Sequence, residues 1–119
     1  MNHLIKKTIF IFLICTLNLN SHAQENKNII TSKFKVDGVC KMCKERIENA
    51  ALIKGVKLAE WNVETDTIKV IYKSNKVNID EIHKSIANIG HSTDKIVANK
   101  EAYDKLPSCC AYMDGVEKH

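Results

Sequence analysis

The chain has 119 residues and a formal net charge of +4, with 18 lysine and arginine residues against 14 aspartate and glutamate residues. This length provides for one small domain with a modest core. The charge is too balanced for a nucleic-acid-binding surface, so no nucleic acid is expected among the partners.

Residues 1–23 have the pattern of a secretory signal peptide, because two lysines precede an apolar stretch over residues 9–19 and a Ser-His-Ala sequence follows. The apolar stretch is shorter than the roughly 20 residues of a membrane span, so no stable membrane insertion is expected after cleavage before Gln24. Cys15 leaves lipid anchoring as an alternative, although a bulky residue precedes it. We expect an exported protein of the bacterial periplasm.

The first two elements of the remaining chain are predicted to be a strand and a helix. Apolar and polar residues alternate over residues 32–36, as in a half-buried strand. Apolar residues then recur at helical spacing from Lys41 to Lys54, and Gly55 provides a stop.

A hairpin, a second helix and a last strand are predicted next. Residues 59–63 and 67–72 are strand-like and flank a turn near residues 65 and 66. Asn78 and Glu81 form a capping-box pattern before an isoleucine stripe that Gly90 ends, with His83 expected to face solvent. A short strand over residues 94–98 would complete the domain.

This order predicts an α+β fold, the ferredoxin-like βαββαβ sandwich, in which two helices cover one face of a four-stranded antiparallel sheet. In that arrangement the first strand–helix loop, the hairpin tip and the loop after the second helix share one end of the domain. Cys40, Cys43 and His91 are therefore predicted to be neighbours.

The motif Cys40-Lys41-Met42-Cys43 lies where a strand passes through Gly38 into a helix. A helix N-terminus stabilises a thiolate, and two intervening residues let both sulfur atoms converge on one ion. Thiolates favour soft ions such as Cu(I) and zinc over magnesium or calcium. In an oxidising compartment the competing interpretation of such cysteines is a structural or redox disulfide.

Residues 31–98 resemble the heavy-metal-associated domain of copper chaperones, metal-pumping ATPases and periplasmic mercury-binding proteins. The resemblance implies a protein without enzymatic activity that binds Cu(I) or Hg(II), with Zn(II) and Cd(II) as further candidates. It also implies ion transfer by ligand exchange to a membrane metal transporter or efflux component, and a monomer or metal-bridged dimer. It rests on Val36-Asp37-Gly38, Cys40-Lys41-Met42-Cys43, Arg46-Ile47-Glu48, Gly55-Val56 and Ile86-Ala87-Asn88-Ile89-Gly90.

Two features depart from the usual pattern of that family. The loop before Cys40 is one residue shorter and lacks the methionine of the family's Gly-Met-Thr, and His91 stands where many bacterial members have an aromatic residue. His91 is a candidate ligand, and Met42 offers a soft thioether.

Residues 99–119 form a C-terminal extension in which a short helix is expected to end before Pro107. Cys109 and Cys110 follow, and three roles are open to them. They could complete a site of three or four sulfur atoms, trap a passing ion, or form a disulfide with the first pair. Two adjacent cysteines bond to each other only through a strained ring, which disfavours a Cys109–Cys110 disulfide.

The alternative function is that of a periplasmic thiol-disulfide redox protein that uses Cys40 and Cys43. A thioredoxin-like fold requires a different order of elements and a proline opposite the active pair, whereas Pro107 lies beyond the predicted core. A metal-sensing or docking subunit is a third interpretation.

Overall fold

The computed structural model describes residues 28–119, so the predicted signal peptide and Cys15 lie outside the described residues. Within them, no helix combines the length and the apolar character that a membrane crossing needs. The elements in chain order are β1 (Ile29–Lys35), α2 (Lys41–Ala51), β2 (Val56–Asn62), β3 (Thr67–Lys73), α3 (Ile79–Asn88), α4 (Lys100–Asp104) and the 3-10 turns η2 (Ser108–Cys110) and η3 (Tyr112–Asp114).

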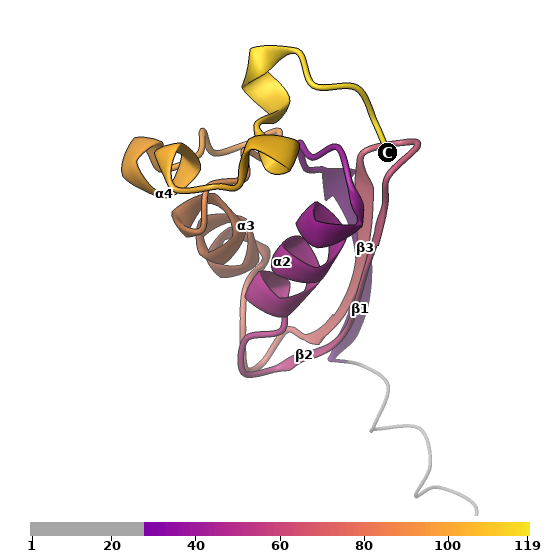
Figure 1. Cartoon of the computed structure of the whole chain (residues 1–119). Coiled ribbons are helices and arrows are strands. Elements are labelled where there is room, and N and C mark those ends of the chain that lie inside the picture. Colours follow the sequence, from indigo (N-terminus) through magenta and orange to yellow (C-terminus); the bar gives the residue numbers. More distant parts are fainter. Residues whose placement is uncertain (1–27) are drawn as a thin grey trace, which may run out of the picture.

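The strands form an antiparallel sheet in the order β1-β3-β2, and α2 and α3 lie against one of its faces (Figure 1). Ile68 at the centre of β3 pairs with Phe34 of β1 and with Trp61 of β2. Side chains alternate between the two faces of a strand, so Ile68, Val70 and Tyr72 of β3 are all buried. The predicted hairpin is present, and Asp66 in its turn has a positive φ of 54°.

The two helices bury the apolar stripes that the sequence predicts. Ile47 and Ala51 of α2 and Ile82 and Ile86 of α3 are fully buried in one core with the sheet. Asn78 and Glu81 form the predicted capping box at the start of α3. Helix α2 ends at Ala51 instead of continuing to residue 54, because the next residues turn towards β2.

The prediction of a fourth strand over residues 94–98 is wrong, and the described sheet has three strands. Only an isolated bridge between Val36 and Thr93 remains beside β1. Immediately after it, the Thr93 hydroxyl accepts hydrogen bonds from the N–H groups of Lys95 and Ile96, and the Thr93 N–H donates to the Ile96 carbonyl. These bonds fold the segment into a tight turn and occupy the N–H groups of Lys95 and Ile96, so pairing with β1 does not continue beyond the bond from the Asp94 N–H to the Lys35 carbonyl, 3.1 Å long.

The extension after this turn returns over the domain by way of α4. Gly90, which has φ +102°, allows this return, since a Cβ there would lie 2.9 Å from the backbone nitrogen of Tyr103. The chain then crosses the end of the domain where α2 begins (Figure 1). The C-terminal residues thereby reach the end of the domain that carries the cysteines.

Candidate metal centre

Cys40 and Cys43 lie at the start of α2 and are both buried. Cys40 is the N-cap of the helix, and its Sγ accepts a hydrogen bond from the Cys43 N–H over 3.4 Å. The two Sγ atoms are 3.2 Å apart. The helix start therefore positions both sulfur atoms towards one point and supplies a backbone donor to one of them.

Trp61 of β2 supports the loop that carries Cys40. Its indole N–H donates to the Val36 carbonyl over 2.9 Å, and the side chain is 2% exposed. A Cβ on Gly38 would lie 2.9 Å from two ring atoms of Trp61 and 3.1 Å from Cβ of Cys43. Glycine at position 38 thus allows the loop to pack directly between the indole and Cys43.

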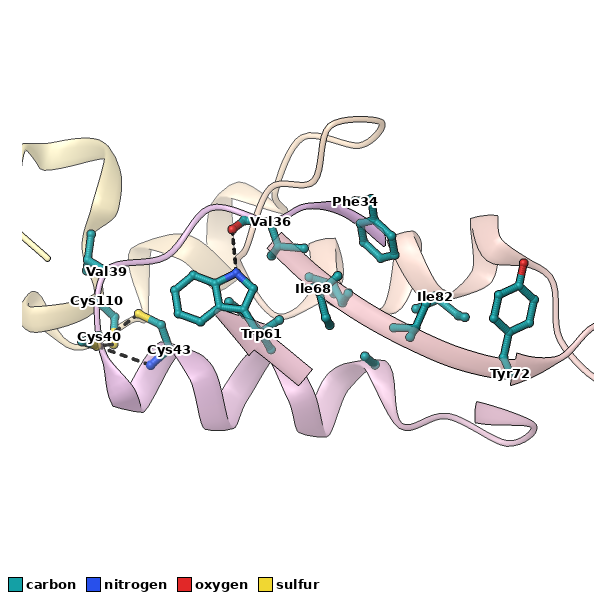
Figure 2. Close-up of a cluster of buried hydrophobic side chains, with 14 of the residues drawn as sticks. Phe34, Val36, Val39, Cys40, Cys43, Trp61, Ile68, Tyr72, Ile82 and Cys110 are labelled. Carbon is teal, nitrogen blue, oxygen red and sulfur yellow. Dashed lines mark hydrogen bonds between the residues drawn. The ribbon is translucent and has the colours of Figure 1, made fainter. Parts of the chain in front are cut away.

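Cys110 from the extension joins the pair, and Figure 2 shows the three cysteines together at one end of the core. Its Sγ lies 3.3 Å from that of Cys40, and the three Sγ atoms all lie within 4.8 Å of one another. Cys110 is fully buried. Cys109 lies outside this cluster, and its Sγ is 3.7 Å from the thioether sulfur of Met42. All four cysteines of the described residues are free thiols.

The three clustered thiols differ in acidity. Burial favours the neutral form of Cys40, but hydrogen bonds from the Cys43 N–H, the neighbouring thiols and the Met42 N–H outweigh burial and lower the pKa of Cys40. Burial raises the pKa of Cys43. The pKa of Cys110 is raised as well, by burial and by its hydrogen bonds to Cys43 and Cys40. The backbone N–H donors at the start of α2 therefore favour the thiolate form of Cys40.

His91 lies at the same end of the domain but outside the three-sulfur cluster. It is fully buried, its Nδ1–H donates to the Asp37 carbonyl over 2.7 Å, and its ring stacks on Tyr112 with centroids 5.4 Å apart. Its Nε2 is buried and has no hydrogen-bond partner in the described part of the chain. The structure thus places His91 between the metal-site loop and the extension, where it supports both.

The prediction that His83 faces solvent is wrong. His83 is 3% exposed, its ring stacks on Phe34 with centroids 3.8 Å apart, and its Nδ1 is 2.7 Å from the Thr93 hydroxyl. The spacing of four residues from Ile79 and from Ala87 places His83 on the flank of the apolar stripe. From this spacing the burial of His83 could have been predicted.

Tyr112 was not singled out from the sequence, although it fixes the extension. Its hydroxyl donates to the Gly90 carbonyl over 2.7 Å and accepts from the Ser92 N–H over 3.0 Å. Its ring and that of Tyr103 form a T-shaped pair with centroids 5.1 Å apart. No motif in the sequence marks these contacts, because they depend on the path of the extension.

The free energy of unfolding is expected to fall as the pH is lowered, and replacing His91 with phenylalanine is expected to make this fall smaller. Burial lowers the pKa of His91 below its ordinary value of 6.5, so below that pH the unfolded chain binds a proton that the folded chain does not. Folding stability is then lost as pH falls from 6.5 towards the folded-state pKa, by at most about 1.4 kcal/mol per pH unit for one proton.

Urea unfolding of wild type and His91→Phe between pH 7.5 and pH 5 measures this difference. The variant keeps an aromatic ring beside Tyr112, and His83 titrates in both proteins, so the difference in slope belongs to His91. Equal slopes in the two proteins would contradict the prediction.

Several solved structures share the fold. A CopZ metallochaperone is 29% identical, with a TM-score of 0.52, and the match covers 54% of this chain and 98% of that chain. The N-terminal domain of a potential copper-translocating P-type ATPase from Bacillus subtilis, in its Cu(I)-loaded state, is 25% identical, with a TM-score of 0.50 and coverages of 53% and 81%. Oxidized MerP from Ralstonia metallidurans CH34 shares the fold at 22% identity, with a TM-score of 0.53 and coverages of 56% and 94%.

No curated protein matches the chain. The sequence model of the heavy-metal-associated domain matches residues 33–92, which make up half of the chain. This range contains Cys40, Cys43 and His91 and ends before the extension with Cys109 and Cys110. The resemblance seen in the sequence is thereby confirmed, and the chain belongs to the heavy-metal-associated domain family.

Proposed function

We propose that this protein is an exported carrier of a soft metal ion, held by the thiolates of Cys40 and Cys43. The observation that carries the proposal is the position of the two Sγ atoms, 3.2 Å apart at the start of α2. Thiolate ligands select Cu(I) or Hg(II), with Zn(II) and Cd(II) as further cargo ions. The pattern of residues 1–23 supports export to the periplasm.

Delivery proceeds by ligand exchange to a membrane metal transporter or efflux component. A thiolate of the partner bonds to the ion before a cysteine of this chain leaves, so the ion is never free in solution. The similarity to a CopZ metallochaperone and to a domain of a potential copper-translocating P-type ATPase supports such a partner. No bond of an organic substrate is broken, and the carrier is a monomer or a metal-bridged dimer.

The second candidate function is thiol-disulfide exchange, which the lowered pKa of Cys40 beside the Cys43 thiol favours. Reduction of insulin disulfides by the purified protein would support it. The metal-carrier function is favoured because the chain belongs to the heavy-metal-associated domain family.

Anaerobic titration of the reduced protein with Cu(I), Hg(II) and Zn(II) tests the carrier function. Each addition is made against a competing chelator, and free thiols are counted before and after. We expect one tightly bound Cu(I) or Hg(II) per chain, with Cys40 and Cys43 protected from a thiol reagent. Retention of all free thiols at one equivalent of each ion would overturn the proposal and favour the redox function.

A further inference from the structure

The extension is fixed to the domain on both sides of Cys110. Before it, α4 packs against Gly90, and after it the Tyr112 hydroxyl bonds to the Gly90 carbonyl and the Ser92 N–H. Stacking of Tyr112 on His91 adds a contact beside the loop between β1 and α2. These contacts hold the extension at the loop that follows α3.

The far end of the extension is bound to other parts of the same surface. The His119 N–H donates to the Val39 carbonyl over 2.8 Å, directly before Cys40. Lys118 Nζ donates to the Val63 and Glu64 carbonyls and, over 2.8 Å, to Asp66 Oδ1 at the hairpin turn. Residues 99–119 therefore cross the whole end of the domain, and we call them the strap (Figure 1).

The 3-10 turn η2 directs the two adjacent cysteines of the strap to different environments. The Cys110 N–H donates to the Pro107 carbonyl over 2.8 Å, and Cys110 enters the core beside Cys40 and Cys43. Cys109 remains partly exposed, next to the exposed Met42. The strap thus delivers one thiol to the candidate metal centre and presents the other at its rim.

We propose that Cys110 is the third thiolate of the metal centre and that the strap closes the centre within one chain. This inference rests on the proposed function and names its regulation. An ion that is bound by two cysteines alone has one side open to an incoming thiolate. Cys110 covers that side. A site of three thiolates from one chain suits Cu(I) or Hg(II) and provides one sulfur fewer than the four ligands typical of structural zinc.

Delivery then requires displacement of the strap. The thiolate of the partner first bonds to the ion, and the bond from the ion to Cys110 then breaks, so the ion again has three sulfur ligands and keeps its oxidation state. Cys110 releases its proton to solvent when it binds the ion and regains one when it leaves. A partner that competes with the Tyr112 and Lys118 contacts would therefore accelerate release, whereas small thiols in solution would exchange slowly.

Cys110→Ser and Cys109→Ser are the matched variants for this proposal, because they change adjacent residues of which only one is in the cluster. Each protein is loaded anaerobically with one equivalent of Cu(I), and X-ray absorption counts the sulfur neighbours of copper. We expect three for wild type and for Cys109→Ser, and two for Cys110→Ser. Far-UV circular dichroism confirms that each variant is folded.

Transfer of Cu(I) to a competing chelator provides the kinetic readout. We expect Cys110→Ser to release copper at least about 10-fold faster than Cys109→Ser, because loss even of a group that only supports a metal ligand typically lowers metal affinity about 10- to 100-fold. Tyr112→Phe keeps all cysteines but loses the hydroxyl contacts to Gly90 and Ser92, so it should retain three sulfur neighbours and still release copper faster. This variant also tests the strap if Cys110→Ser does not fold.

Two sulfur neighbours in the wild type, or equal release rates for all four proteins, would overturn the role of Cys110 and the strap. If copper binds with two sulfur neighbours, the carrier function remains and only the strap proposal fails. If the wild type binds no Cu(I), the carrier function fails as well.

Discussion

Replacing both Cys40 and Cys43 with serine is expected to abolish stoichiometric binding of Cu(I) and to lower the affinity by several orders of magnitude. A serine hydroxyl is a hard oxygen donor, so only the thiol of Cys110 would remain in the cluster for a soft ion. Competition with a chromogenic Cu(I) chelator under anaerobic conditions measures the loss.

Serine is the suitable replacement because it preserves the start of α2. Cys40 is the N-cap, and serine is among the best residues at that position since its hydroxyl accepts from the same backbone donor. The double variant should therefore remain folded by circular dichroism. Cys109→Ser serves as the control with one thiol fewer and an intact cluster. Binding of Cu(I) by the double variant with wild-type affinity would contradict the assignment of Cys40 and Cys43 as the principal ligands.

Trp61→Ala is expected to lower the free energy of unfolding by about 3–5 kcal/mol, the cost usual for removing a buried large aromatic side chain. The indole is almost fully buried and packs against Gly38 in the loop before Cys40. Its removal leaves a cavity and also leaves the Val36 carbonyl without its indole donor. Native domains are stable by about 5–15 kcal/mol in total, so this loss would remove a large share of the stability of the fold.

Urea unfolding followed by far-UV circular dichroism measures the effect, because the chain has no other tryptophan to report by fluorescence. Trp61→Phe is the control, since it retains an aromatic ring but lacks the donor to Val36. We expect its loss to be smaller than that of Trp61→Ala. A loss below about 1 kcal/mol for Trp61→Ala would show that the loop is held by other contacts, because buried large-to-small changes cost more than that.

The elements that were predicted correctly are those whose signals are local. The alternation of side chains gave β1 and the hairpin, and Asn78 with Glu81 marked the start of α3. The fourth strand failed because residues 94–98 are governed by the hydroxyl of Thr93, which captures two N–H groups of the segment. Such a turn depends on the orientation of one side chain, and the alternation of apolar and polar residues does not predict that orientation.

The proximity of Cys40 and Cys43 was predictable from their spacing at a helix start. The approach of Cys110 was not, because the length of the extension limits its reach but does not fix its path. That path depends on pairings between distant residues, such as Tyr112 with Gly90 and Lys118 with Asp66. His91 was correctly placed near this end of the domain, yet it contacts Asp37 and Tyr112 instead of joining the sulfur cluster.

The contact between Cys40 and Cys110 joins residues that are 70 positions apart in the sequence. A bond between them, whether direct or through a shared ion, would close a loop that contains most of the described chain. Closing such a loop restricts the unfolded chain and in the chain-entropy model stabilises the fold by about 4 kcal/mol. A cargo ion held by both residues would thus act as a removable cross-link, and a loaded carrier would resist heat and proteolysis better than one that has delivered its ion.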